Sequence, residues 1–290
     1  MDFEVWPGPM EGVGRGDFVR AATGLKLTPR WMTPFIRITE TIPGANKLFS
    51  SVSAYLDSGV PVTIQLMGGN PQLIGECGKL LSSHPAVAGI NLNFGCPSSR
   101  VLKHGSGGDL LSEPESLCSF CQTVANFLPV GKLSVKIRSG RFSHLEMEKI
   151  IPQLCKSQVV EKIFFHYRTV AEGYSSAPLP RRSERIARAV EISDGIPVIA
   201  NGDISSVEEG EKIVADTGAA GVMIARPWLK DPFLLRRFSE VDVPEPVRGR
   251  EIFFASLQRA GITGGALIEL AKLLWGVNSP EFIRVVKNHF

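Results

Sequence analysis

Residues 197–203 read Pro-Val-Ile-Ala-Asn-Gly-Asp, a short apolar run that ends in asparagine, glycine and aspartate. Residues 162–168, Lys-Ile-Phe-Phe-His-Tyr-Arg, have the same form, and residues 221–225, Gly-Val-Met-Ile-Ala, are apolar throughout. Short apolar runs without polar alternation are typical of parallel strands that other elements cover on both faces. These stretches therefore predict buried parallel strands, some of which carry polar groups at their carboxyl ends.

Eight short β-rich runs recur along the chain, several of them nearly all apolar, and most are followed by glycine, proline or asparagine and then by an amphipathic segment. The eight runs are Val5–Pro9, Trp31–Ile38, Val60–Met67, Gly89–Phe94, Leu133–Arg138, Lys162–Arg168, Pro197–Asp203 and Gly221–Ala225. The helix-compatible segments include Leu145–Ser157, Arg182–Ile192 and Val207–Thr217. Strand–helix alternation of this kind predicts either a doubly wound sheet or a closed (β/α)8 barrel, and composition does not separate the two.

The chain has 290 residues, about the length of one α/β barrel with a small appendage, and its composition is that of a globular protein. A net charge of +3 neither proves nor excludes a nucleic-acid partner. No apolar run approaches the roughly 18 residues that span a bilayer, and acids stand near the N-terminus where a secretory signal carries positive charge. Five scattered cysteines favour a reducing compartment. We therefore expect a cytoplasmic protein that makes no membrane contact and acts as a monomer.

The sequence changes character after Phe238. A proline-broken linker, residues 241–247, precedes three segments that predict short helices: Arg250–Ala260, Gly265–Trp275 and Pro280–Asn288. We therefore expect two domains, a barrel over residues 1–241 and a short helical domain over residues 242–290.

In a (β/α)8 barrel, the carboxyl ends of the strands and the loops after them build the functional site. Polar side chains gather at these ends in the predicted strands: Gln65, Asn91, Asn93, Cys96, Lys136, Arg138, His166, Arg168, Asn201, Asp203 and Arg226. Their recurrence at one end of the strands predicts a site there. Cys118-x-x-Cys121 falls inside a predicted helix without a second cysteine pair, so we interpret it as packing and expect no metal site.

The most specific segment reads Leu-Asn-Phe-Gly-Cys-Pro over residues 92–97 and Gly-Ser-Gly-Gly over residues 105–108. A cysteine between a strand end and a glycine-rich loop is free to face a cleft, although burial as an inert thiol is the commoner fate of a free cysteine. With Val135–Arg138, His166–Thr169 and Ile199–Asp203, this segment resembles the successive signature blocks of tRNA-dihydrouridine synthases, in family order. Pro9–Val13 and Gln65 resemble the family's opening strand and third-strand glutamine. The resemblance favours the closed barrel, a (β/α)8 TIM barrel followed by the small helical domain.

The resemblance implies FMN as cofactor, NADPH or NADH as reductant, and reduction of a uridine C5–C6 double bond in the D loop of tRNA. Cys96 would donate a proton to C5, while the reduced flavin supplies a hydride to C6. Lys136 and His166 would lie against the isoalloxazine ring, and Gln65 would bond the pyrimidine edge of the flavin. The cofactor-binding residues of the opening strand would be Pro9, Met10 and Glu11.

The cofactor's phosphate is expected after the last two strands, where barrels commonly bind phosphate. The residues expected there are Asn201, Gly202, Asp203, Ala225 and Arg226. Backbone N–H groups approach an anion closely at such turns, and an arginine binds phosphate in a bidentate manner. The family usually has glycine in the place of Ala225, whose methyl group narrows access to the backbone.

The residues expected to contact RNA are Arg37, Asn93, Arg168 and Tyr174. Pro9-Met10-Glu11 and Phe35-Ile36-Arg37 most resemble the bacterial C-type enzymes, in which Arg37 takes the place of a substrate-orienting arginine. Asn93 would help to hold a uridine that has left its stack. The arginines Arg181, Arg182, Arg185 and Arg188 fit two interpretations equally well, a phosphate-binding surface and a solvated helix face.

Two departures from the family pattern keep other functions open. Pro34 stands where many relatives have glutamate, and the tail is shorter than the family's usual RNA-binding domain. One alternative is an FMN ene-reductase that acts on ribosomal RNA or a small pyrimidine. Others are a catalytically silent RNA-binding barrel and, more remotely, a flavin-free barrel isomerase that binds phosphate.

Overall fold

The computed structural model describes residues 3–96, 106–173, 180–240 and 242–288. Parallel strands form one nine-stranded sheet in the order β1-β9-β8-β7-β6-β5-β4-β2, with β3 also paired to β4. The strands are β1 Glu4–Pro7, β2 Trp31–Met32, β3 Ile36–Arg37, β4 Val62–Met67, β5 Val87–Asn93, β6 Leu133–Arg138, β7 Ile163–His166, β8 Val198–Asn201 and β9 Gly221–Ile224. Because β2 and β3 pair with the same neighbour, they are two parts of one barrel strand. The ring therefore has eight strand positions, which confirms the predicted (β/α)8 barrel.

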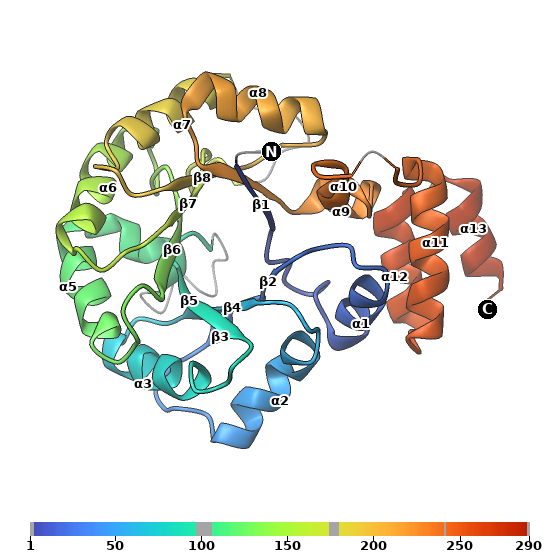
Figure 1. Cartoon of the computed structure of the whole chain (residues 1–290), viewed down its shortest axis with the longest axis horizontal. Coiled ribbons are helices and arrows are strands. Elements are labelled where there is room, and N and C mark those ends of the chain that lie inside the picture. Colours follow the sequence, from blue (N-terminus) through green and yellow to red (C-terminus); the bar gives the residue numbers. More distant parts are fainter. Residues whose placement is uncertain (1–2, 97–105, 174–179, 241, 289–290) are drawn as a thin grey trace.

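The helices lie outside the ring of strands, as Figure 1 shows. Those of the barrel are α1 Gly16–Gly24, α2 Ala45–Leu56, α3 Pro71–Leu81, α5 Pro114–Ala125, α6 Met147–Lys156, α7 Arg182–Glu191, α8 Val207–Thr217, α9 Arg226–Lys230 and α10 Leu234–Arg237. Two 3-10 helices, η1 Gly107–Ser112 and η2 His144–Glu146, follow β5 and β6. Ser206 is the N-cap of α8, since its hydroxyl accepts a hydrogen bond from the Glu209 N–H at 3.2 Å.

The predicted strands are right in place, but several are shorter than expected. The run 31–38 is interrupted between β2 and β3, where Pro34 has no N–H to donate to a ladder. The runs 162–168 and 197–203 shorten to β7 and β8, because their last residues leave the ladder. Those polar residues therefore line the mouth of the barrel instead of extending its wall.

Alternation along the strands separates two apolar cores. Residues that face outward, such as Ile64 and Leu92, pack with the surrounding helices in the larger core. The smaller core fills the barrel and consists of Trp6, Met32, Phe164, Ile199 and Met223. The barrel interior is therefore apolar on the side of β1, β2, β7, β8 and β9, which leaves the polar interior positions of β4, β5 and β6 together.

Charged groups join β1 to its neighbours at the amino-terminal end of the barrel. Glu4 in β1 pairs with Arg30, just before β2, at 2.8 Å and also pairs with Lys162, just before β7. The Arg30 guanidinium lies 4.7 Å from the centroid of the Trp6 ring. β1 and β2 are the two ends of the hydrogen-bonded order, so the Glu4–Arg30 pair links the ends of the sheet.

Three helices form the tail, α11 Pro246–Arg259, α12 Gly264–Trp275 and α13 Pro280–Lys287. The first begins four residues earlier than predicted, at Pro246, because proline suits the first turn of a helix. The tail lies beside α1 and α9 (Figure 1), and the Phe18 and Phe253 rings pack edge to face with centroids 5.3 Å apart. In the described ranges, no helix has the length and apolar character that crossing a membrane would need.

Candidate functional site

Amide side chains inside the barrel form a hydrogen-bonded network between β4, β5 and β6. The sheet register pairs Gln65 with Asn91 and Asn91 with Ser134, which places these interior side chains next to one another. Gln65 Nε2 donates to Asn91 Oδ1 at 2.8 Å, and Asn91 Nδ2 donates to Ser134 Oγ at 2.9 Å. Asn93 Nδ2 donates to Gln65 Oε1 at 2.8 Å. Gln65, expected to contact the cofactor, is thus fully buried and already bonded at both ends of its amide.

The turn that carries Cys96 is held on both sides. The Gly95 N–H donates to Asn93 Oδ1 at 3.0 Å, and the Gly95 carbonyl accepts from Arg138 Nε at 2.9 Å. On the other side, the Gly108 N–H donates to the Cys96 carbonyl at 3.2 Å. The Cys96 side chain itself is partly exposed. A partly exposed thiol on a turn with fixed backbone bonds is suited to meet a substrate in one orientation.

Arg138 has a positioning role that the sequence analysis did not assign. Its side chain is buried, and Nη1 donates to the carbonyls of Thr169 at 2.8 Å and Gly173 at 3.2 Å. Together with its bond to Gly95, these contacts link the Cys96 turn to the loop after β7. The sequence did contain a signal for this role, because Arg138 lies two residues after Lys136 and therefore on the same face of β6.

Lys136 is an amine held inside a positively charged site. It occupies an interior position of β6, opposite Asn93 in the register, and is half-buried. Burial and, secondarily, the charge of Arg138 lower the pKa of Lys136 to about 7, while Cys96 opposes the shift. Within the described part of the chain, its ammonium group has no hydrogen-bond or ion-pair partner. An anionic ligand would find here a cation that no protein carboxylate has neutralised.

His166 ends β7 and is buried. Burial and then the charges of Arg138, Lys136, Arg168 and Arg226 lower its pKa well below the usual value, so the ring is neutral at pH 7. The Arg168 N–H donates to His166 Nδ1 at 3.2 Å. A neutral ring that accepts at Nδ1 carries its proton on Nε2, which leaves Nε2 as a donor.

Asp203 collects three partners at the end of β8. Its Oδ2 accepts from the Tyr167 hydroxyl at 2.5 Å and from Arg168 Nη2 at 2.7 Å. Its Oδ1 lies 3.7 Å from Arg226 Nη2. Arg168 was expected to contact RNA, but its side chain is 1% exposed, so such a contact would require the ion pair to open. Arg226 keeps 55% of its side chain exposed and is accessible to an anion.

The opening strand fits tightly against the end of β9. A Cβ on Gly8 would lie 2.6 Å from the Ala225 Cβ, so the methyl group of Ala225 is accommodated because residue 8 is glycine. Gly202, at φ +117°, is similarly close to Tyr167, since a Cβ there would lie 2.8 Å from its ring. Asn201 Nδ2 donates to the Met223 carbonyl at 2.9 Å and ties β8 to β9.

The remaining expected residues take different positions. Pro9, Met10 and Glu11 follow Gly8 at this mouth; Glu11 lies at the surface, and partial desolvation raises the pKa of its carboxyl. Arg37 ends β3, and its buried Nε has no hydrogen-bond partner in the described ranges. It lines a cavity of about 340 Å³ together with Asn70 and Ser106. Asn93 holds the Cys96 turn, and Tyr174 lies outside the described residues.

The arginines around α7 are engaged by carboxylates of neighbouring segments. Arg182 pairs with Glu209 at 2.8 Å, Arg185 with Glu172 at 2.8 Å and Arg188 with Glu148 at 2.7 Å. Arg181 precedes the helix and pairs with Glu184 at the surface. These contacts favour a structural role over a phosphate-binding surface.

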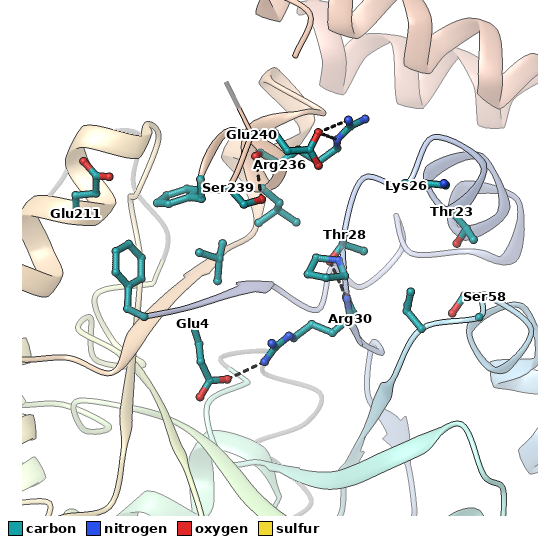
Figure 2. A pocket seen from close by; sticks show the side chains of 17 residues that line it. Glu4, Thr23, Lys26, Thr28, Arg30, Ser58, Glu211, Arg236, Ser239 and Glu240 are labelled. Atoms are coloured by element: carbon teal, nitrogen blue, oxygen red, sulfur yellow. Dashed lines mark hydrogen bonds and ion pairs between the residues drawn. The ribbon is translucent and has the colours of Figure 1, made fainter. Parts of the chain in front are cut away.

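A larger cavity, about 1000 Å³, lies at the opposite, amino-terminal end of the barrel (Figure 2). Its lining includes Glu4 of β1, the Arg30 segment before β2 and the Ser58 segment before β4. Figure 2 shows two ion pairs along this cavity, Glu4 with Arg30 and Arg236 with Glu240, so each of these charges already has a partner within the protein. Cys96, Lys136 and His166 do not line it, so size alone does not make it the functional site.

Comparisons with known proteins agree with the geometry. A family model described as dihydrouridine synthase (Dus) matches residues 8–256. A probable tRNA-dihydrouridine synthase of Aquifex aeolicus is 32% identical over 62% of this chain and 56% of its own length. A tRNA-dihydrouridine(16) synthase of Cupriavidus necator is 35% identical over 63% of this chain and 55% of its own length. The match to both therefore spans little more than half of each relative.

A tRNA-dihydrouridine(16) synthase of Salmonella typhimurium matches more completely, at 30% identity over 96% of this chain and 91% of its own length. Among solved structures, TcOYE with pHBA superposes with a TM-score of 0.60 at 9% identity, over 89% of this chain and 95% of that one. A variant of NCR from Zymomonas mobilis has a TM-score of 0.56 at 14% identity, over 81% of this chain and 85% of that one. At these identities, the solved structures support the barrel fold alone.

Proposed function

The chain belongs to the dihydrouridine synthase family, and we propose that it is a flavin-dependent oxidoreductase that reduces the C5–C6 double bond of a uridine in tRNA. The observation that carries the proposal is the juxtaposition at the end of β5 and β6. A partly exposed cysteine on a braced turn lies near a half-buried lysine that has no carboxylate partner among the residues that the structure describes. The tRNA-dihydrouridine(16) synthase names of the relatives make uridine 16, in the D loop, the first position to test.

FMN fits the residues at the carboxyl ends of the strands. Among the described residues, Lys136 offers a cation without a carboxylate partner, His166 carries an N–H at Nε2, and Arg226 exposes 55% of its side chain. Gly202 adopts a φ of +117° that favours glycine, and a Cβ at this position would lie 2.8 Å from the Tyr167 ring. The turn after β8 therefore has room for glycine only. The buried network around Gln65 fits less directly, because Gln65 must exchange a hydrogen bond before it can contact a ligand.

The chemistry divides between cofactor and protein. FMN, when bound, would supply the hydride for uridine C6, and we propose NADPH or NADH as the source of the electrons. The Cys96 thiol gives its proton to C5, which breaks the S–H bond and leaves a thiolate that takes a proton from water. Asn93 and Arg138 hold the Gly95 peptide and so aim the thiol. Lys136, when protonated, stabilises negative charge beside it.

The substrate must present its uridine outside the base stack, because a stacked base shields C5 and C6 from groups at the barrel mouth. Arg37, with its unpartnered buried Nε beside Ser106, is proposed to contact the RNA there. All five cysteines are free thiols, which fits the proposed cytoplasmic location.

Purified protein and an unmodified tRNA transcript test this function. We expect a yellow protein that releases FMN on denaturation and, with NADPH or NADH, adds two hydrogen atoms to one uridine of the transcript. Mass spectrometry of nuclease fragments locates the product. A colourless protein that takes up no FMN would overturn the proposal. Dihydrouridine in ribosomal RNA but not in tRNA would favour the alternative substrate instead.

A further inference from the structure

The turn after β6 exposes an aromatic side chain. Phe142 is 71% exposed, whereas most large apolar side chains of the described chain are buried. Single exposed apolar side chains are common on protein surfaces, so the case for Phe142 depends on where its ring lies and on how its backbone is held.

The turn is built to keep Phe142 in place. The Glu146 carboxylate accepts hydrogen bonds from the N–H groups of Arg141 at 2.6 Å, Phe142 at 3.3 Å and Ser143 at 3.1 Å. Ser143 and Glu146 form a capping box at the start of η2. The backbone that carries Phe142 is therefore ordered before any partner binds, which reduces the entropic cost of binding.

The same turn is braced between the two loops of the site. On one side, Arg141 pairs with Asp109, and Arg141 Nη1 donates to Ser112 Oγ at 2.6 Å. Asp109 directly follows Gly108, whose N–H holds the Cys96 carbonyl. On the other side, the Val170 N–H donates to the Gly140 carbonyl at 2.9 Å. Phe142 thus lies on the rim at which the proposed substrate would arrive.

We propose that Phe142 is a stacking platform for a nucleobase next to the uridine that is reduced, an inference that rests on the proposed function. When a uridine leaves its stack, a neighbouring base loses a partner, and an exposed aromatic ring can replace that partner. The Arg141 guanidinium, which also pairs with Asp109, lies 5.0 Å from the Phe142 ring centroid, so a planar cation lies beside a ring that would meet RNA. Leu145, three residues later, is also 63% exposed, but only Phe142 offers a π face, and an aromatic ring beside a guanidinium favours a base over an apolar protein segment.

The test compares variants of Phe142 with a variant of Val130. Val130 is 99% exposed and precedes β6, at the opposite end of the barrel. We expect F142A to weaken the affinity for unmodified tRNA about 5- to 100-fold, as expected for loss of one stacked base. F142W should bind like wild type, F142L should bind like F142A, and V130A should bind like wild type. Reduction of the bound flavin by NADPH without RNA should be equal in all variants.

Equal tRNA affinity of F142A and wild type would overturn the inference. So would an F142L variant that binds like wild type, because leucine offers apolar contact without a π face and would indicate a protein-like contact.

The two proposals fail separately. If wild type binds tRNA but forms no dihydrouridine, the proposed function fails and the affinity comparison still decides the role of Phe142. If F142A modifies tRNA with unchanged KM and Kd, this inference alone fails. A wild-type protein that binds no RNA overturns both.

Discussion

Cys96 is the side chain on which the proposed reaction depends most directly. Its neighbours in the chain are fixed by Asn93, Arg138 and the Gly108 N–H, so removal of the thiol should leave the turn in place. Cys118 offers a matched control, because it is also a partly exposed free thiol but lies on α5.

We expect C96A to retain FMN and to lose about 100- to 10,000-fold in the rate of dihydrouridine formation, the usual contribution of a positioned acid. C118A should retain wild-type activity. Single-turnover assays with pre-reduced enzyme measure the effect without interference from the reductant step. Wild-type turnover in C96A would exclude the thiol as proton donor.

The charge of Lys136 should make cofactor binding depend on pH. In the free protein its pKa is about 7, so its positive charge is lost as pH rises through this value. A bound anion favours the charged form and raises the pKa, so affinity for FMN should fall by up to about tenfold per pH unit above 7. K136M should bind FMN weakly and without this dependence, whereas K149M, at an exposed position of α6, should behave like wild type.

The lowered pKa of Lys136 has the opposite effect on the pH dependence of the stability of the free protein. Between pH 7 and 10.5, the unfolded chain binds a proton at Lys136 that the folded chain does not, so the free energy of unfolding contributed by this group rises with pH. Flavin fluorescence titrations and denaturant unfolding over this range measure both trends. A wild-type FMN affinity that rises above pH 7 would contradict the role of Lys136.

Between elements, Arg138 connects the end of β6 with two loops. Its guanidinium bonds the carbonyls of Gly95, Thr169 and Gly173, a fork that a lysine ammonium cannot reproduce from one position. Arg138 therefore supports both the loop after β5 and the loop after β7, and the orientation of the Cys96 thiol depends on this side chain.

We expect R138K to lower the free energy of unfolding by about 1–3 kcal/mol, since buried carbonyls lose donors. It should also lower kcat about 10- to 100-fold with a smaller change in KM, because a thiol in the wrong orientation slows the chemical step more than it weakens substrate binding. The rate of Cys96 alkylation should change in parallel. R188K, at a half-exposed ion pair with Glu148, should change stability by less than about 1 kcal/mol. Unaltered alkylation and kcat in R138K would exclude a positioning role.

Over the whole chain, the tail helices and the barrel share a packed interface. Phe253 of α11 meets Phe18 of α1, and the Ser256 hydroxyl donates to the Ala21 carbonyl at 3.1 Å. Phe18 also packs against Trp228 of α9, so the aromatic contacts reach from the tail into the barrel. The expected boundary near residue 241 remains a prediction about folding units.

We expect F253A to cost about 3–5 kcal/mol, the usual cost of removing a buried phenylalanine side chain. I283A, at an exposed position of α13, should stay within about 0.5 kcal/mol of wild type. Thermal unfolding followed by circular dichroism should show one transition in wild type because the interface couples the two parts. Two separate transitions would instead indicate that the tail folds independently.

Local patterns predicted the framework of the molecule well. The short β-rich runs located all eight barrel positions, and the polar residues toward their carboxyl ends marked the end of the barrel where Cys96, Lys136 and His166 gather. The boundaries were less accurate where Pro34 interrupts a ladder and where β7 and β8 end early. The partners of individual side chains were not predictable. Gln65 and Asn91 are bonded across 26 residues, and Arg168 and Asp203 across 35.

The order of residues already contained the strand periodicity, the glycines and the positions of Cys96 and Lys136 at strand ends, because these depend on neighbours along the chain. It did not contain the burial of Arg168, the pairing of the α7 arginines or the bracing of Phe142. Those depend on strand register and on which loops meet at one mouth, and long-range packing alone brings such groups within hydrogen-bond distance. Folding therefore decided which arginines pair with a carboxylate, since a charge buried in the fold must be satisfied within it.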